Sequence, residues 1–228
     1  MKLAAPLSIL ALALACRFAV AASAATDLDE VLRAVPNLEH GAQLFETCAQ
    51  CHGPHGGGLP SGWVPQIAGQ HPRVLAKELI DYRHRARWDD RMEKIAGRHL
   101  LTVSQDIADV TAYVASLAPA RTGTVGSGEW LGRGRHLYEA HCRSCHGADG
   151  EGDNAKFVPR VAGQQCEYLL RQLHDAVDGR RPNLVRGHVQ LLRDLGMEEL
   201  EGLADYISRL PGSPQHPDER TAAAGPSL

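Results

Sequence analysis

The sequence lacks several features that would place it in a common functional class. Its 24 Lys and Arg residues are offset by 27 Asp and Glu residues, for a formal net charge of −3. It therefore has no basic surplus of the kind that nucleic-acid-binding proteins carry. Beyond the N-terminal segment, no apolar run reaches the ~18 residues of a membrane-spanning helix. Aromatic residues make up only 5% of the chain, so a core built from protein side chains alone is expected to be thin.

The first 25 residues have the pattern of a secretory signal peptide. A positively charged start precedes a short apolar run over residues 3–15, and Ala22-Ser23-Ala24 offers a small-x-small cleavage site. Because Arg17 interrupts the apolar pattern, an uncleaved membrane anchor is the alternative. We predict cleavage near residues 24–25, which would leave a soluble, periplasmic mature chain.

Cysteine and histidine occur in two identical frames. These are Cys48-Ala49-Gln50-Cys51-His52 and Cys142-Arg143-Ser144-Cys145-His146. The C-x-x-C-H frame is the attachment signal of c-type haem. Two thiols three residues apart lie on one helical turn and reach the two vinyl groups of one porphyrin, and the next histidine faces the iron. We predict two covalent haem c groups, bound through Cys48, Cys51, Cys142 and Cys145, with His52 and His146 as iron ligands.

Other roles for these cysteines fit the sequence less well. A zinc site usually has closely spaced ligand pairs, whereas 91 residues separate Cys51 from Cys142. A thioredoxin-like redox pair needs a nearby βαβ pattern, and none is present. A disulfide within either pair would close a strained small loop.

The surroundings of the two frames repeat as well. A shift of 94 residues places Pro65 on Pro159 and Ala68-Gly69-Gln70 on Ala162-Gly163-Gln164. Upstream of the cysteines the shift is 93, and it places Gly41 on Gly134. The second copy therefore has one extra residue just before its first cysteine. This pattern predicts an internal duplication.

Each repeat is predicted to be helical. In the first repeat we expect helices over residues 38–49 and 72–85, and a last helix beginning at Ser104, which can cap it. No alternating strand pattern of useful length occurs, so we predict an all-α fold. The predicted division is a signal peptide (1–25), an N-terminal haem domain (26–118), a linker (119–128), a C-terminal haem domain (129–211) and a disordered tail (212–228).

This arrangement resembles the two-haem class I cytochromes c of the cytochrome c4 type. The two C-x-x-C-H-G frames, the two Val-Pro-x-x-Ala-Gly-Gln stretches and the two terminal Tyr-bearing helices carry the resemblance. It implies two tandem all-α haem domains that carry single electrons between periplasmic redox proteins. No catalytic residue and no nucleic-acid partner is expected, and any peripheral association with a membrane would run through the partner proteins.

The resemblance also implies a methionine on the far side of each haem. Met92 lies 40 residues after His52, in an expected loop before the last helix, and is the predicted sixth ligand of the first iron. The matching position of the second repeat is Val185 or Arg186, neither of which is a normal haem ligand.

The second iron therefore needs another ligand. His188 lies 42 residues after His146 and is the preferred candidate. The alternatives are Met197, which maps to the start of the last helix, Cys166, His174 or an open site. Replacing methionine by histidine removes a thioether that favours ferrous iron, so the second haem should have the lower potential. Electrons would then enter at the second repeat and leave from the first.

Several further residues carry weaker expectations. Gln70 and Gln164 are expected to hydrogen-bond within the haem loops. Arg73, Lys77 and Arg160 are candidates for pairing with haem propionates, and a basic cluster at residues 83–91 near Met92 is a candidate docking site for an acidic partner. The alternative function is a haem oxidoreductase, or a cytochrome subunit of one, that acts on sulfur or nitrogen compounds.

Overall fold

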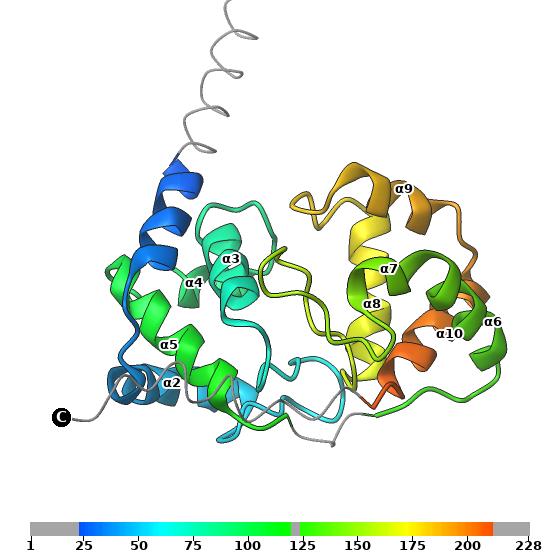
Figure 1. The fold of residues 1–228 in the computed structure, drawn as a ribbon, viewed down its shortest axis with the longest axis horizontal. Helices are drawn as coiled ribbons and strands as arrows, with labels where there is room; N and C mark the ends of the chain where they lie inside the picture. The colour runs from blue at the N-terminus through cyan, green and yellow to red at the C-terminus, as the bar shows by residue number, and fades with distance from the viewer. Residues whose placement is uncertain (1–22, 120–123, 212–228) are drawn as a thin grey trace, which may run out of the picture.

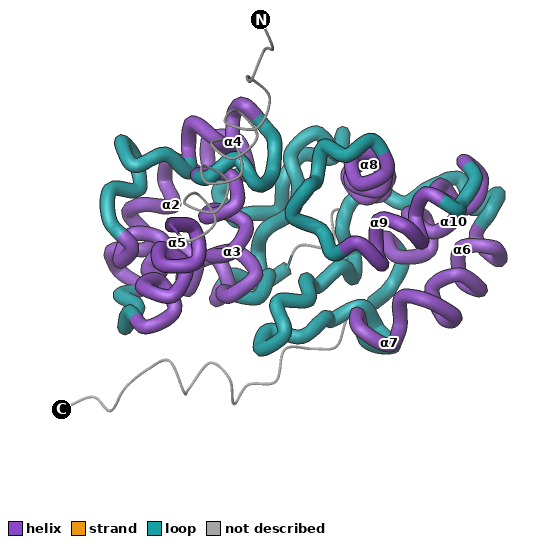
Figure 2. The backbone as a smooth tube through the Cα atoms, turned by 90° about the horizontal axis from the view of Figure 1, so that it is seen from above, coloured by secondary structure: helices purple, strands orange, loops and turns teal. Residues whose placement is uncertain are grey.

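The computed structural model describes residues 23–119 and 124–211. Apart from an isolated bridge between Asp153 and Val158, these residues form only helices and loops, which confirms the predicted all-α fold. Figure 1 shows two helical lobes side by side, an N-terminal lobe and a C-terminal lobe, and Figure 2 shows their loops meeting between them. Most of the predicted signal peptide (1–22), part of the linker (120–123) and the predicted tail (212–228) lie outside the described residues.

Two of the long helices of the N-terminal lobe begin where the sequence predicts. Pro72 occupies the first turn of its helix, where its missing N–H costs no hydrogen bond. Asp106, and not Ser104 as predicted, caps the helix that starts at Ser104, because it accepts hydrogen bonds from the N–H groups of Thr102 (2.6 Å) and Val103 (3.1 Å). The hydroxyl of Ser104 donates to Glu30 (2.8 Å) instead. The helices are α2 (Leu38–His52), α3 (Pro72–Arg83), α4 (Asp90–Ile95) and α5 (Ser104–Ser116).

The C-terminal lobe repeats this order with one local difference. Its helices are α6 (Leu131–Leu137), the π-helical turn η1 (Tyr138–Cys142), α7 (Arg143–His146), α8 (Cys166–Val177), α9 (Arg186–Arg193) and α10 (Met197–Ser208). In η1 the N–H of Arg143 reaches back five residues to the carbonyl of Tyr138. A π-turn accommodates one additional residue within a helix, so it explains the extra residue found before Cys142.

In each lobe the helix that leads into the C-x-x-C-H frame, α2 or α6, crosses the last helix at a glycine. A Cβ atom on Gly41 would lie 2.2 Å from the carbonyl oxygen of Asp109 in α5, and one on Gly134 would lie 1.8 Å from that of Gly202 in α10. Both distances are far inside van der Waals contact, so the helix pairs approach closely only because these positions lack side chains. Tilted aromatic pairs flank both crossings, with ring centroids 5.4 Å apart for Phe45–Tyr113 and 5.5 Å apart for Tyr138–Tyr206.

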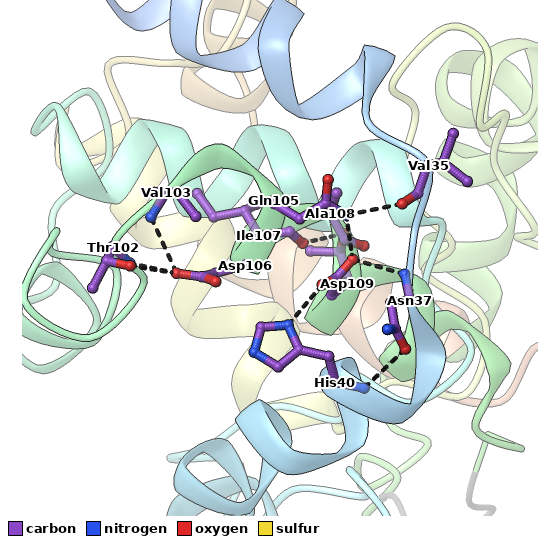
Figure 3. Close-up of polar contacts among 11 residues, drawn as sticks. Val35, Asn37, His40, Thr102, Val103, Gln105, Asp106, Ile107, Ala108 and Asp109 are labelled. Carbon is purple, nitrogen blue, oxygen red and sulfur yellow. Dashed lines mark hydrogen bonds and ion pairs between the residues drawn. The ribbon is translucent and has the colours of Figure 1, made fainter.

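A buried carboxylate ties the start of α2 to α5 (Figure 3). Asp109 accepts hydrogen bonds from the N–H of Asn37 (2.8 Å), from Nδ1 of His40 (2.7 Å) and from Nε2 of Gln105 (2.6 Å). Burial alone would raise the pKa of Asp109, but the hydrogen bonds from Asn37 and His40 outweigh it and hold the pKa below its usual range. The site therefore favours the ionised carboxylate.

An N-terminal helix over residues 23–33 packs on the N-terminal lobe, and the sequence patterns did not predict it. Leu28 and Val31 pack against the core, and Asp27 accepts hydrogen bonds from Nε2 of His84 (3.0 Å) and Nη2 of Arg98 (2.6 Å). Residues 23–25, assigned from the sequence to the signal peptide, start this helix. No helix within 23–119 or 124–211 is long and apolar enough to cross a bilayer.

Candidate haem sites

Each C-x-x-C-H frame ends a helix, and each histidine is held by a proline carbonyl. His52 closes α2, and its Nδ1 lies 2.9 Å from the carbonyl oxygen of Pro65. His146 closes α7, and its Nδ1 lies 3.1 Å from that of Pro159. A carbonyl can only accept, so Nδ1 donates and Nε2 keeps the lone pair that a metal ion needs.

Glycines allow close packing of the loops that carry Pro65 and Pro159 next to the two histidines. Gly58 and Gly152 both have φ of +73°, a left-handed conformation that side chains disfavour. A Cβ atom would lie 2.5 Å from the carbonyl carbon of Pro65 at Gly58, and 2.6 Å from that of Pro159 at Gly152. The repeated Gly and Pro positions in the sequence thus position the two histidines.

The cysteines of each pair differ in environment. Burial raises the pKa of the Cys48 and Cys142 thiols to about 11, whereas Cys51 and Cys145 are exposed. Within the described part of the chain, no group of three or more His, Cys, Asp or Glu side chains gathers as a metal-binding cluster.

In the C-terminal lobe His188 faces His146. Their ring centroids are 6.5 Å apart, with an angle of 56° between the ring planes. Two imidazoles that bind one metal ion from opposite sides, each at about 2 Å, have centroids about 6 Å apart. Burial, and then the neighbouring His146, lower the pKa of His188, which favours its neutral, ligating form. The two histidines therefore fit an iron between them.

The element that carries His188 differs from the expectation. By its correspondence to Met92, which was expected in a loop, His188 would lie in a loop as well, whereas it lies in the eight-residue helix α9. Met92 was likewise expected in a loop, but it lies half-buried in the six-residue helix α4. Asp89 caps α4 through the N–H of Met92 (3.1 Å). Burial lowers the pKa of His52, while the hydrogen bond to the Pro65 carbonyl and the Asp89 carboxylate oppose that shift.

The other candidate ligands of the second iron are placed differently. Met197 begins α10 and is 56% exposed. Cys166 begins α8 as a buried free thiol within the core of the C-terminal lobe, and burial raises its pKa to about 11. His174 lies in the last turn of α8. Among the described residues, His188 is the candidate whose ring faces that of His146.

The two glutamines after Ala-Gly bond within their own loops, as predicted, since Oε1 of Gln70 accepts from the N–H of His71 (3.0 Å) and Oε1 of Gln164 from that of Gln165 (3.1 Å). They also bond across the lobes, which was not predicted. Gln164 accepts from the N–H of Gln66 (3.1 Å) and donates to its carbonyl (2.8 Å). Gln70 accepts from the N–H of Arg160 (2.9 Å) and donates to its carbonyl (2.8 Å). Since Gln66 and Arg160 occupy matching positions in the two repeats, the contacts are related by exchanging the lobes, as at a two-fold interface.

A second pair of contacts follows the same exchange. Nε2 of His71 lies 2.7 Å from the carbonyl oxygen of Glu151, and Nε2 of Gln165 donates to that of Gly57 (3.0 Å). The shift of 94 relates His71 to Gln165 and Gly57 to Glu151. These contacts were missed because propensity and spacing describe each repeat by itself, although a duplicated chain predicts self-complementary contacts.

Part of the expected basic docking cluster is used within the fold, while the side chains of Arg85 and Arg91 stay 81% and 63% exposed. Arg83 donates to the carbonyls of Ala96 and Leu101, and His84 contacts Asp27. Arg87 crosses the interface to the hydroxyl of Tyr168 (2.8 Å) and to Gln172 (2.5 Å), and also pairs with Glu78. Arg85 and Arg91 pair with the neighbouring carboxylates of Glu93 and Asp89.

The arginines proposed for haem propionates remain suited to that role. The Nε atoms of Arg73 and Arg160 are buried and have no hydrogen-bond partner in the protein. A buried donor without a partner is costly, so an anionic group of a bound porphyrin would stabilise both. Lys77, the third candidate, pairs with Asp81 one helical turn away.

Known proteins resemble this chain over both lobes. The Cytochrome c family matches residues 38–118 and 131–211. Cytochrome c4 of Azotobacter vinelandii is 32% identical over 181 residues, covering 72% of this chain and 84% of that protein. A thiosulfate dehydrogenase electron acceptor of Stutzerimonas stutzeri (strain A1501) is 31% identical over 176 residues, covering 72% and 78%.

A solved structure agrees with these matches. Reduced recombinant cytochrome c4 from Pseudomonas stutzeri superposes with a TM-score of 0.67 at 25% identity, covering 77% of this chain and 99% of that one. Together with the paired C-x-x-C-H frames, these matches indicate two covalently bound haem c groups, one in each lobe. The chain therefore belongs to the cytochrome c family, as a two-haem electron-transfer protein of the cytochrome c4 type.

Proposed function

We propose that the protein carries single electrons between periplasmic redox proteins through two haems with different axial ligands. The N-terminal haem would be held by Cys48 and Cys51, with His52 and Met92 on its iron. The C-terminal haem would be held by Cys142 and Cys145, with His146 and His188 on its iron. Each bound haem supplies an Fe(III)/Fe(II) couple that accepts and releases one electron.

The His146–His188 arrangement carries this proposal. The ring separation of 6.5 Å suits two imidazoles on opposite sides of one iron. The helix α9 holds His188 in place, so no large loop movement is needed. Both rings have a pKa lowered by burial, which keeps their nitrogen lone pairs available.

The different ligands would give the electron a direction. His188 lacks the soft thioether of Met92, so it stabilises ferrous iron less and lowers the potential of the second haem. Electrons would enter through the C-terminal lobe and leave through the N-terminal lobe. Cleavage near residues 24–25 would release the chain into the periplasm with Asp27, Leu28 and Val31 still in place on the N-terminal lobe.

A second candidate function is the electron-accepting subunit of an oxidoreductase that acts on sulfur compounds. The likeness to a thiosulfate dehydrogenase electron acceptor favours it. It assigns the same haem ligands and adds a specific donor. Rapid reduction of this protein by a purified thiosulfate-oxidising enzyme would support it, and reduction no faster than that of an unrelated cytochrome would exclude it.

Low-temperature EPR with magnetic circular dichroism of the oxidised holoprotein tests the ligand assignment. We expect two low-spin signals, one typical of His/Met ligation and one of bis-His ligation. A high-spin or thiolate-ligated signal from the second haem would contradict the proposal and favour a catalytic site. A redox titration should show two separate waves, and two overlapping high-potential waves would count against His188.

A further inference from the structure

We propose that Gln70 and Gln164 link each proximal histidine to the opposite lobe, so that each lobe tunes the reduction potential of the haem held by the other. The proposal rests on His52 and His146 being haem ligands, as in the proposed function. It makes the two glutamines positioning residues, since neither touches a haem ligand directly. Their effect would pass through a single peptide group on each side.

The first link runs from the C-terminal lobe to His52. The carbonyl of the Pro65–Gln66 peptide accepts from Nδ1 of His52 (2.9 Å). The N–H of the same peptide donates to Oε1 of Gln164 (3.1 Å). Gln164 is 9% exposed and is fixed by its second bond, from Nε2 to the carbonyl of Gln66 (2.8 Å).

The second link runs in the other direction. The carbonyl of the Pro159–Arg160 peptide accepts from Nδ1 of His146 (3.1 Å). The N–H of this peptide donates to Oε1 of Gln70 (2.9 Å), and Nε2 of Gln70 donates to the carbonyl of Arg160 (2.8 Å). Both proximal histidines therefore end on a peptide whose N–H is held by the other lobe.

The chemistry of the peptide group transmits the effect. When its N–H donates a hydrogen bond, its carbonyl oxygen gains electron density and becomes a better acceptor. A better acceptor draws the Nδ1 proton of the histidine more strongly and makes the ligating nitrogen more basic. A more basic ligand favours Fe(III), so each glutamine should lower the potential of the haem in the opposite lobe.

The two links differ in one respect. The N–H of Gln66 is shared between Oε1 of Gln164 and Oε1 of Gln165, each at 3.1 Å. The counterpart of Gln165 is His71, whose Nε2 contacts the carbonyl oxygen of Glu151 instead. Loss of Gln164 therefore leaves Gln66 a second acceptor, whereas loss of Gln70 removes the acceptor described for Arg160.

The test compares Gln70→Met and Gln164→Met in the full-length holoprotein. Methionine matches the length of glutamine but lacks its amide. Gln172→Met is the control, because Gln172 bonds to Arg87 at the same interface and touches neither peptide. Spectroelectrochemical titration gives the potential of each haem, and the ligand-dependent EPR signals assign each potential to its lobe.

We expect Gln70→Met to raise the potential of the C-terminal haem, and Gln164→Met to raise that of the N-terminal haem by a smaller amount. Gln172→Met should change neither. The double variant Gln164→Met/Gln165→Met should enlarge the shift of the N-terminal haem. Potentials that stay unchanged, that change only in the substituted lobe, or that follow Gln172→Met equally would overturn the proposal.

This result is separable from the ligand assignment on the opposite side of the irons. If EPR of the unsubstituted protein shows that His188 does not bind, the proposed function fails, but the potentials still test the links to His52 and His146. If the spectra show both expected low-spin centres and the potentials do not respond, the inference alone fails. Unchanged low-spin spectra in each variant would show that the ligands themselves are intact.

Discussion

The two lobes share one side of their haem sites and differ on the other. In both, a helix ends in C-x-x-C-H, a glycine loop brings a proline carbonyl to the histidine, and a glycine marks the main helix crossing. Before the last helix, the N-terminal lobe has the six-residue helix α4 with Met92, and the C-terminal lobe has the eight-residue helix α9 with His188. The attachment side is thus built alike in both lobes, while the proposed distal ligands would differ in type and in the helix that carries them.

The lobes also differ in what supports their last helix. In the N-terminal lobe the helix over residues 23–33 adds Leu28 and Val31 to the core. In the C-terminal lobe a segment without helix contacts α10 instead. The N–H groups of Gly126 and Gly128 donate to the carboxylate of Asp205 (2.9 and 2.7 Å). The segments that precede the first repeat and the second repeat therefore differ in structure.

The largest expected effect is on the distal ligand of the C-terminal lobe. His188→Met should make the two lobes alike and raise the potential of the second haem by on the order of 0.1–0.2 V, within the ~0.8 V range that axial ligands cover. Redox titration measures the shift, and EPR should lose the bis-His signal. An unchanged potential with an unchanged EPR spectrum would mean that His188 is not the ligand.

The next largest effect is expected on stability, from substitutions at the two helix crossings. Gly134→Ala and Gly41→Ala place a Cβ atom against backbone oxygen, 1.8 Å and 2.2 Å away respectively. We expect each to destabilise its lobe by about 1–3 kcal/mol or more, with Gly134→Ala the worse. Gly132→Ala is the matched control, because nothing lies within 4 Å of its Cβ position in the same helix. Denaturant unfolding of the holoproteins measures the order, and equal stability of all three variants would refute this packing argument.

An intermediate effect is expected from a charge that only one lobe has. Glu78 of the N-terminal lobe corresponds to Gln172, and its half-buried carboxyl pairs with Arg87 of its own lobe and with Arg181 across the interface. Although burial opposes ionisation, these arginines and Lys77 lower the pKa of Glu78 from 4.5 to about 2.

Because the folded pKa lies below the unfolded value, this carboxylate contributes stability above pH ~4.5 and loses it as the pH falls towards 2. We expect a contribution of about 1–2 kcal/mol, reduced by the partial exposure of the side chain. Unfolding measured across this pH range should show the loss in the unsubstituted protein and a smaller loss in Glu78→Gln. The same pH dependence in both proteins would exclude Glu78 as its source.

The smallest effect on stability and on the haem potentials is expected from Met197, the alternative ligand candidate for the second iron. Met197 is 56% exposed at the start of α10, so Met197→Leu should change stability by no more than about 0.5 kcal/mol. The potentials and EPR signals of both haems should stay the same. A loss of low-spin signal from the C-terminal lobe in this variant would assign the second iron to Met197 and end the proposed role of His188.

The elements nearest the attachment motifs were predictable from the sequence. Pro72 and Ser104 begin helices as expected. These helix starts were predictable because helix-start signals and proline geometry act locally. The covalent haems were predictable for the same reason, since the C-x-x-C-H frame is contiguous.

The distal helices and the interface were not predictable in this way. The helices α4 and α9 have only six and eight residues, too few for a periodic stripe to separate them from loops. The helix over residues 23–33 was hidden by its overlap with a signal-peptide pattern. The contacts of Gln70 and Gln164 depend on how two folded lobes meet, and no spacing within either repeat encodes that.

The π-helical turn over Tyr138–Cys142 confines the consequences of an insertion to five residues. In a regular α-helix, one added residue would rotate everything upstream by about 100°, which would move Gly134 off Gly202 and turn the apolar face away from α10. Here the widened turn absorbs that rotation, so the crossing upstream and the attachment motif downstream both keep their orientation. The lobe has thus changed its length at a point where neither its packing nor its cofactor attachment had to be rebuilt.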